Sequence, residues 1–311
     1  MPPSVPHDSE LGDGGAEQLD LEGTVAWRAL YAEAQARLTG VVDSPEVDAR
    51  RIVEEASGYE GAELYLVFDE PVTELGMAHY DEMIERRLRG EPLQYVLGRW
   101  GFRQLDLAVN AHVLIPRPET EQVVEVALGL IASDRPQRVL DLGTGSGAIA
   151  LSVAAERPSA QVWAVERSPD AVRVARGNLA GIGPAAARVR LVEGSWFDPL
   201  ERALQGSFDV IISNPPYVAA TESLPPVVRD WEPNEALVSG PTGLESIAQI
   251  LAEAPRWLVS GGCLVIELGA TQAEEAVELA RRSGFGRTAV HPDLAGRDRA
   301  LVAQLADGGM S

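Results

Sequence analysis

A glycine-rich segment that follows a short apolar run constrains the fold more than any other feature of the sequence. Residues 139–147 read Val-Leu-Asp-Leu-Gly-Thr-Gly-Ser-Gly, and a helical pattern starts at Ala148. Glycines permit a tight turn and allow a ligand to approach the backbone closely. The third glycine comes one residue earlier than in the GxGxxG of NAD- and FAD-binding folds, and the sequence has no GxxxxGK[ST] phosphate loop. The segment therefore predicts a strand–loop–helix unit that binds a cofactor.

An alternation of helices and strands begins at about residue 120. Strands are predicted at 138–142, 161–165, 188–192, 210–213 and 263–268, with one or two more after Thr288. Helices are predicted at 121–132, from 148 onward, and at 168–179, 244–258 and 273–283, while 183–187 is expected to be a loop. Strands separated by helices predict an α/β fold with a parallel, doubly wound sheet.

The N-terminal part of the chain has a different character. Residues 1–23 are rich in Pro, Gly, Asp and Glu without periodicity, which predicts a disordered acidic tail. Residues 24–90 predict a small helical domain, with helices ending near Gly40, starting at Ser44-Pro45-Glu46, and spanning about 74–88. In the first of these, the apolar residues at helical spacing are Trp27, Leu30, Ala34 and Leu38.

Residues 91–118 are expected to bridge the two domains. Apolar and polar residues alternate around Leu105, Leu107 and Val109, and Asn110-Ala111 is typical of a turn. The bridge is therefore predicted to contain a β-hairpin that turns at Asn110-Ala111.

Composition excludes several classes of function. The single cysteine, Cys263, and the four scattered histidines predict neither a disulfide nor a metal site. No long apolar run and no basic-then-apolar N-terminus is present, so we expect no membrane span and a cytoplasmic location. The formal net charge of −21 repels phosphate backbones, so no direct nucleic-acid binding is expected.

Two acidic residues flank the glycine segment. Glu166 ends the second predicted strand, 166 − 147 = 19 residues after Gly147. A carboxylate at this place can accept hydrogen bonds from both hydroxyls of a ribose, although a solvated strand end is the alternative. Asp141 precedes the loop and either is satisfied by loop amides or orients the loop and meets a cationic end of the cofactor. The sequence leaves both roles open.

The predicted strand at 210–213 runs into Asn214-Pro215-Pro216-Tyr217. The two prolines fix φ and stiffen the backbone. The side-chain oxygen of Asn214 and a main-chain carbonyl, that of Pro215 by the usual geometry, can accept both hydrogens of one –NH₂ group. The ring of Tyr217 can stack on a planar group. A plain turn after a core strand is the alternative, which the order of loop, acid and this motif disfavours.

Such a pair of acceptors suits methylation of an amide or aryl-amine nitrogen. This nitrogen is a poor nucleophile because its lone pair is delocalised into the π system. Two in-plane acceptors orient the group, favour positive charge on nitrogen and aim it at the methyl of a sulfonium. The chemistry needs neither a metal nor a covalent nucleophile.

These motifs make the sequence similar to class I S-adenosylmethionine-dependent methyltransferases, and it most closely resembles the PrmC/HemK family. That family methylates the glutamine of the Gly-Gly-Gln motif in peptide chain release factors. The resemblance spans about residues 24–305 and rests on EPLQYVLG (91–98), VLIPRPETE (113–121), the 141–147 loop, NPPY (214–217), Glu232-Pro233, Ala236-Leu237 and Gly243-Leu244. The bridge segments are more specific than NPPY, which adenine and cytosine amino-methyltransferases share.

The resemblance implies a Rossmann-like, doubly wound sheet that is mostly parallel, with one antiparallel strand near the C-terminus. A small N-terminal helical domain (24–90) would dock the substrate, and a hairpin (91–118) would join it to a catalytic domain (119–307) that binds S-adenosylmethionine and releases S-adenosylhomocysteine. The family's acid on the second strand is often Asp, so Glu166 is a mild departure.

The resemblance also implies roles for individual residues. The cofactor residues would be Asp141, Gly143, Thr144, Gly145, Ser146, Gly147, Glu166, Trp196 and Asn214. Asn214, Pro215 and Tyr217 would be catalytic, and Asn214, Pro215, Pro216, Tyr217 and Phe102 would bind the substrate, with Pro116–Glu119 at the pocket mouth. Trp196 and Phe102 have core packing as their alternative role.

Three other functions compete with this one. A sister family that shares NPPY and the domain order methylates a glutamine of a ribosomal protein. A nucleic-acid amino-methyltransferase would need basic patches and a pocket for a flipped base. A non-catalytic scaffold would show a degenerate loop or NPPY motif. Since release factors contact RNA, a basic partner surface fits the acidic chain, and electrostatic steering is expected to aid their encounter.

Overall fold

The computed structural model describes residues 24–307, so the predicted tail at 1–23 lies outside the described residues. The chain divides into two compact units, one through Ile84 and one from Glu85 onward. No helix in the described range is long and apolar enough to cross a membrane.

The first unit is helical, as the apolar spacing predicts. Its helices are α1 (Trp27–Leu38), α2 (Pro45–Ser57), α3 (Ala62–Val67) and α4 (Glu74–Leu88), the last of which continues into the second unit. The four residues at helical spacing in α1 are its buried residues. The hydroxyl of Tyr80 donates to the carbonyl of Leu30 at 2.9 Å and so ties α4 to α1. Helix α3 was not predicted because six residues are too few to show a period.

The bridge segment contains helix α5 (Leu93–Leu97) and a hairpin of β1 (Arg99–Phe102) and β2 (Leu105–Ala108). The hairpin turns at Arg103-Gln104 and not at Asn110-Ala111. A turn does occur at Asn110-Ala111, where the amide of Val113 donates to the carbonyl of Asn110 at 3.1 Å, but it follows the hairpin. Arg103 has a φ of 52°. Its amide donates to Glu121 at 2.9 Å and its guanidinium pairs with Glu156 at 2.6 Å. These distant partners stabilise a turn that local sequence does not favour.

The second unit is built on a seven-stranded sheet with the order β10-β11-β9-β6-β3-β4-β5. Its strands are β3 (Gln137–Leu142), β4 (Ala160–Glu166), β5 (Val189–Glu193), β6 (Phe208–Ser213), β9 (Leu258–Glu267), β10 (Phe285–Pro292) and β11 (Asp298–Leu305). Only β11 runs antiparallel to its neighbours β9 and β10. The predicted mostly parallel sheet with one antiparallel strand near the C-terminus is confirmed.

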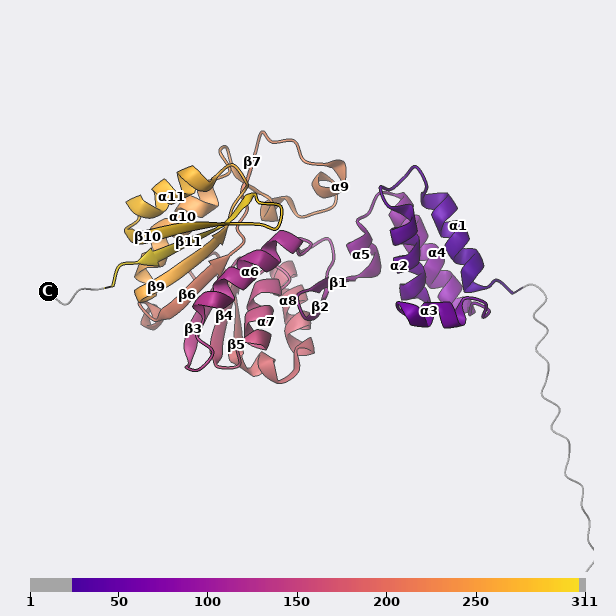
Figure 1. The fold of residues 1–311 in the computed structure, drawn as a ribbon, viewed down its shortest axis with the longest axis horizontal. Coiled ribbons are helices and arrows are strands. Elements are labelled where there is room, and N and C mark those ends of the chain that lie inside the picture. Colours follow the sequence, from indigo (N-terminus) through magenta and orange to yellow (C-terminus); the bar gives the residue numbers. More distant parts are fainter. Residues whose placement is uncertain (1–23, 308–311) are drawn as a thin grey trace, which may run out of the picture. The chain divides into compact units, whose positions relative to one another are not determined.

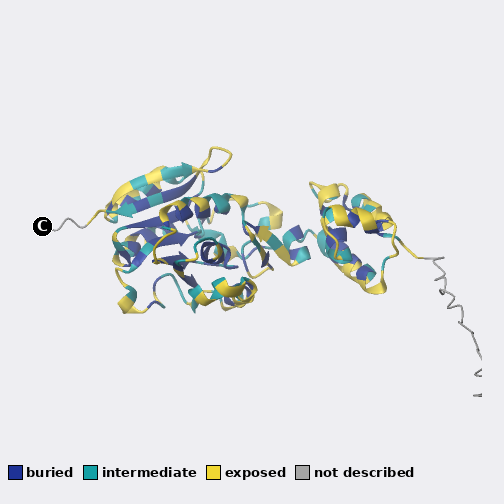
Figure 2. Cartoon of the chain, turned by 60° about the horizontal axis from the view of Figure 1, so that its bottom comes forward, coloured by how far each residue is buried: buried dark blue, intermediate teal, exposed yellow. Residues whose placement is uncertain are grey.

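Helices cover both faces of this sheet (Figure 1). They are α6 (Pro118–Leu130), α7 (Ala148–Glu156), α8 (Pro169–Gly181), α10 (Glu245–Glu253) and α11 (Ala273–Arg282), and α9 (Pro226–Arg229) is a single turn. Alternate strand residues enter two cores. Leu140 and Leu142 pack in the core with α10 and α11, whereas Val139 packs in the core with α6 and α7. The central strands are buried on both faces (Figure 2).

Two smaller elements differ from the sequence expectation. Residues 183–187, expected as a loop, belong to a short 3₁₀ helix, Gly183–Arg188. A parallel ribbon of β7 (Val218–Ala219) and β8 (Val238–Gly240) follows the NPPY segment.

The strand order places a ligand crevice at a defined position. The chain leaves β3 towards β4 and β5 on one side, and later returns to β6 on the other side of β3. In open α/β sheets, ligands bind at the carboxyl ends of the strands where the strand order reverses in this way. The expected crevice therefore lies beyond β3 and β6.

Candidate active site

A cavity of about 330 Å³ occurs at this position. The predicted site residues that line it are Gly143, Thr144, Gly145, Ser146, Glu166, Trp196, Asn214 and Pro216. They come from the ends of four parallel strands, so the fold brings together residues more than 70 positions apart in the sequence. Pro215, Tyr217, Asp141, Gly147 and Phe102 are not part of this lining.

The glycine loop takes a backbone conformation that other residues adopt at a cost. Gly143, Gly145 and Gly147 have φ values of 72°, 56° and 90°. A Cβ on Gly147 would lie 2.9 Å from Leu151, whereas a Cβ on Gly145 would meet no atom within 4 Å. The loop at Gly145 thus requires glycine for its conformation and leaves open space beside the backbone, as a bound cofactor needs.

Asp141 is fully buried beneath the loop. Its Oδ2 accepts from the hydroxyl of Thr144 at 2.5 Å and from the amide of Ala150 at 3.1 Å. Its Oδ1 has no hydrogen-bond partner among the described residues. Burial raises the pKa of Asp141 to about 7. These contacts favour the loop-orienting role over direct contact with a cofactor.

Glu166 stands at the end of β4 on the cavity wall, with only 8% of its surface exposed. Its Oε2 accepts from the amide of Gly145 and its Oε1 from the amide of Ser168, both at 2.9 Å. Each carboxylate oxygen can accept one more hydrogen bond, so Glu166 can bind these two amides and still accept hydrogen bonds from two hydroxyls of a ligand.

Trp196 follows β5 and packs over the glycine loop. Its φ of 44° is unusual for a residue with a side chain, and such outliers cluster at functional sites. The ring atom Cζ3 lies 3.4 Å from the position that a Cβ on Gly143 would take. The indole of Trp196 therefore lines the cavity and also packs against the core, so one ring can contact a cofactor and contribute to core packing.

The side-chain amide of Asn214 is held on one side only. Its Nδ2 donates to the hydroxyl oxygen of Thr120 at 3.1 Å, and Thr120 donates to Oε2 of Glu267 at 2.7 Å. Among the described residues, Oδ1 of Asn214 accepts no hydrogen bond, and Asn214 lines the cavity. The geometry leaves this oxygen as an acceptor for a ligand.

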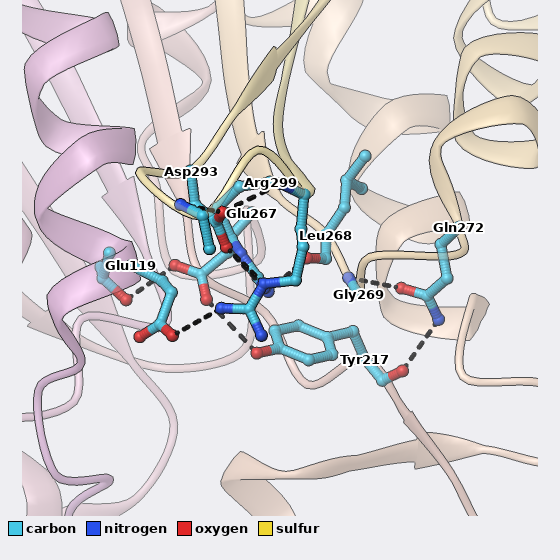
Figure 3. Close-up of polar contacts among 11 residues, drawn as sticks. Glu119, Tyr217, Glu267, Leu268, Gly269, Gln272, Asp293 and Arg299 are labelled. Atoms are coloured by element: carbon cyan, nitrogen blue, oxygen red, sulfur yellow. Dashed lines mark hydrogen bonds and ion pairs between the residues drawn. The ribbon is translucent and has the colours of Figure 1, made fainter.

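Tyr217 is anchored at both ends. Its hydroxyl donates to Oε1 of Glu267 at 3.4 Å, and its carbonyl accepts from Gln272 at 2.9 Å (Figure 3). Burial and the neighbouring carboxylate of Glu267 raise the pKa of Tyr217, so this hydroxyl stays protonated.

The structure does not bring Phe102 to the cavity. Phe102 is 1% exposed and packs in the core with α6 and α7. Of the segment expected at the pocket mouth, Pro116 and Arg117 line the cavity, and Arg117 forms an ion pair with buried Glu232. The other oxygen of Glu232 accepts from the amide of Ile115 at 3.1 Å, which joins two segments that are distant in the sequence.

Sequence reasoning missed part of the site. Thr120 and Glu267 were not selected, although Glu267 ends a buried apolar strand just as Glu166 does. One further wall is formed by residues between β7 and the end of α10, which include Glu235, Ser239 of β8 and Gln249 of α10. No local signal marks these residues, because the path of the loop from β6 to α10 decides what they face. The described part of the chain holds no cluster of His, Cys, Asp or Glu suited to a metal ion.

Comparison with known proteins gives the family. Residues 29–98 match the model of the PrmC N-terminal domain, and residues 123–230 match the methyltransferase small domain. The chain is 40% identical over 266 residues to the release factor glutamine methyltransferase of Geobacter sulfurreducens, covering 85% of this chain and 91% of that protein. The chain belongs to the release factor glutamine methyltransferase family. The family resemblance seen in the motifs is thereby confirmed, and the chain is a methyltransferase.

Other comparisons agree. The release factor glutamine methyltransferase of Bifidobacterium longum is 40% identical over 286 residues, covering 88% of this chain and 96% of that protein. The solved structure of a methyltransferase from Pyrococcus furiosus superimposes with a TM-score of 0.50 at 20% identity, over 71% of this chain and 97% of that one. This likeness shows the class I methyltransferase fold.

Proposed function

We propose that this protein transfers a methyl group from S-adenosylmethionine to the side-chain nitrogen (N5) of the glutamine in the Gly-Gly-Gln motif of peptide chain release factors. The observation that carries the proposal is the orientation of Asn214. Its amide nitrogen is committed to Thr120, which leaves its oxygen free beside the glycine loop. The related proteins from Geobacter sulfurreducens and Bifidobacterium longum are release factor glutamine methyltransferases, which supports release factors as the substrate class.

The residues on the cavity wall fit S-adenosylmethionine. Gly143–Ser146 allow close approach, the carboxylate of Glu166 can receive the ribose hydroxyls, and the ring of Trp196 offers an apolar face to the adenine. When bound, this cofactor supplies a methyl group on a sulfonium whose leaving group is a neutral thioether. In this proposal Asp141 acts from beneath, by holding the loop through Thr144.

The NPPY segment then orients the target. Asn214 Oδ1 and the carbonyl of Pro215 accept the two hydrogens of the glutamine amide, while Tyr217 packs against its plane. Both acceptors favour the positive charge that develops on nitrogen as it attacks. A rigid pair of prolines fixes this geometry before the substrate arrives, which supplies much of the rate enhancement through positioning.

The proposal assigns docking of the release factor to the helical domain at residues 24–90, and catalysis to residues 119–307. The substrate is a protein, and no direct nucleic-acid binding is proposed for a chain with a net charge of −21.

Mass spectrometry of an unmethylated release factor after incubation with the protein and S-adenosylmethionine tests the proposal. We expect a gain of one methyl group on the Gly-Gly-Gln glutamine, and no gain with Asn214→Ala that still binds the cofactor. A ribosomal protein and DNA serve as parallel substrates. Methylation of either of these in place of the release factor would overturn the proposed substrate.

A further inference from the structure

We propose that Glu267 is a positioning residue that sets the orientation of the Asn214 side chain through the hydroxyl of Thr120. The inference rests on the proposed function, in which the oxygen of Asn214 receives the target amide. It assigns a role to two residues that lie outside the NPPY motif.

A carboxamide cannot be oriented by shape, because its oxygen and its NH₂ group are nearly the same size. Only its hydrogen-bond partners decide which end faces a ligand. The partner of Asn214 is the hydroxyl oxygen of Thr120 at 3.1 Å. A hydroxyl can donate or accept, so it does not by itself choose the end of the amide that it binds.

Glu267 determines which way the proton of the Thr120 hydroxyl points. An ionised carboxylate only accepts, so the proton of Thr120 points to Oε2 of Glu267 at 2.7 Å. The lone pairs of the Thr120 hydroxyl then face Asn214 and bind its Nδ2. The oxygen of Asn214 is consequently presented to the cavity as an acceptor, as recognition of a target –NH₂ group requires.

The fold places Glu267 well for this role. It ends β9, the parallel neighbour of β6, where Ser213 pairs with Ile266, so Glu267 and Asn214 leave adjacent strands side by side. Glu267 is 1% exposed. Its second oxygen accepts from the hydroxyl of Tyr217 (Figure 3), so one carboxylate supports two residues of the NPPY segment.

The groups around Glu267 make the relay sensitive to pH. Arg299 of β11 stabilises the carboxylate, whereas Glu119 of α6 opposes it, and the guanidinium of Arg299 also binds the carbonyl of Leu268 and the carboxylate of Asp293. Burial is the strongest influence and raises the pKa of Glu267 to about 7. A protonated Glu267 can donate to Thr120, which can then donate to Asn214 and turn the amide round. Activity should therefore decline as the pH falls through about 7.

Kinetics of variants test the relay. Thr120→Val keeps the shape and removes the hydroxyl, and we expect kcat for the release factor to fall by about 10- to 100-fold with an unchanged dissociation constant for S-adenosylmethionine. Thr120→Ser should restore kcat to near the wild-type value. Thr288→Val, the same change on β10 at the far edge of the sheet, is the matched control and should be neutral. In Glu267→Gln the decline of kcat below pH 7 should disappear.

A second readout does not depend on catalysis. The chain has four asparagines, so selective ¹⁵N labelling gives few side-chain amide signals, and Asn214→Ala identifies the one of interest. We expect this signal to shift with a midpoint near pH 7 in the wild type and to stay constant in Glu267→Gln.

The inference is overturned if Thr120→Val keeps the wild-type kcat or loses cofactor binding. An Asn214 signal that does not change with pH would overturn the pH dependence assigned to Glu267. These outcomes differ from failure of the proposed function. If the proposed function fails, the wild type does not methylate a release factor. The Asn214 signal still shows whether Glu267 and Thr120 orient the Asn214 side chain.

Discussion

Glu166 is the residue through which cofactor affinity is most directly tested. Glu166→Gln replaces one acceptor oxygen by an NH₂ group, which cannot accept a hydrogen bond. The amide of Gly145, the amide of Ser168 or a ribose hydroxyl of the cofactor would then lose its acceptor. A lost hydrogen bond to a charged group costs about 1.5–3 kcal/mol, so the dissociation constant for S-adenosylmethionine should rise by roughly 10- to 100-fold. Isothermal titration calorimetry measures it.

The neighbouring strand offers a matched control for this change. Glu193 pairs with Glu166 across β4 and β5 at the same level, yet it is exposed and does not line the cavity. Glu193→Gln should leave the affinity within about twofold of wild type, as expected for an exposed charge. Equal affinities in the two variants would show that Glu166 does not receive the cofactor.

Asp141 should make stability depend on pH. Its pKa in the folded protein is about 7 against a usual 3.8, because burial disfavours the charge. Between these values the folded state binds the proton more tightly than the unfolded state, so the free energy of unfolding falls as pH rises and levels off above about 7. Asp141→Asn removes this dependence.

Urea denaturation of cofactor-free protein measures the effect. From pH 5 to pH 8 the stability of the wild type relative to Asp141→Asn should decrease by roughly 3 kcal/mol. Comparing the wild type with Asp141→Asn at each pH cancels the contributions of the other carboxylates to the free energy of unfolding. A constant difference would mean that Asp141 is ionised in the fold despite its burial.

Candidate site residues could be selected from the sequence where the signal is contiguous, and the structure places Gly143–Ser146 and Asn214 on the cavity wall. The loop at 143–147 and Asn214 belong to short motifs whose geometry is local, so they could be selected from the sequence. Thr120 and Glu267 are 147 positions apart and meet only because β9 and α6 pack together. An aromatic residue such as Phe102 fits a pocket or a core equally well, and only the packing of the hairpin decides.

At the scale of elements, the loop after β7 and β8 supports Tyr217. Gly243 has a φ of 82°, and a Cβ there would lie 2.5 Å from the carbonyl oxygen of Tyr217. Gly243→Ala should therefore displace the NPPY segment and lower kcat. It should also reduce the free energy of unfolding by more than about 1–2 kcal/mol, which is the cost of backbone strain alone. Urea unfolding and kcat are the measurements.

Gly183→Ala separates strain from crowding. Its φ of 62° is also positive, but no atom lies within 4 Å of the Cβ position. This variant should show the strain alone and keep the wild-type kcat. If both variants lose the same stability and retain activity, the contact with Tyr217 does not matter.

The elements that could be predicted are those whose period is visible. Strands such as β3 and β6 are buried on both faces and read as apolar runs, and α1 shows its buried stripe directly. The ribbon of β7 and β8 has only two or three residues in each strand, which is too short for any period. The hairpin turn at Arg103 depends on Glu121 and Glu156 in other elements, so its position could not be read locally.

At the scale of the whole molecule, charge bears on the encounter with the substrate. The chain carries 47 acidic and 26 basic side chains, a formal net charge of −21. Because release factors contact RNA, we expect them to present basic surfaces that complement this acidic chain. Complementary charge raises association rates more than it tightens the final complex, and salt screens it over a Debye length of roughly 10 Å at 0.1 M.

The value of kcat/KM for an intact release factor should therefore fall by roughly tenfold between 50 and 300 mM NaCl, because this parameter contains the association rate. A short neutral peptide that contains Gly-Gly-Gln has little charge to steer, so its kcat/KM should change by less than about twofold, and it controls for effects of salt on the active site. The value of kcat at saturating release factor should stay constant, because chemistry follows the encounter. If kcat/KM for the intact protein is as insensitive to salt as that for the peptide, the acidic surface does not guide the substrate.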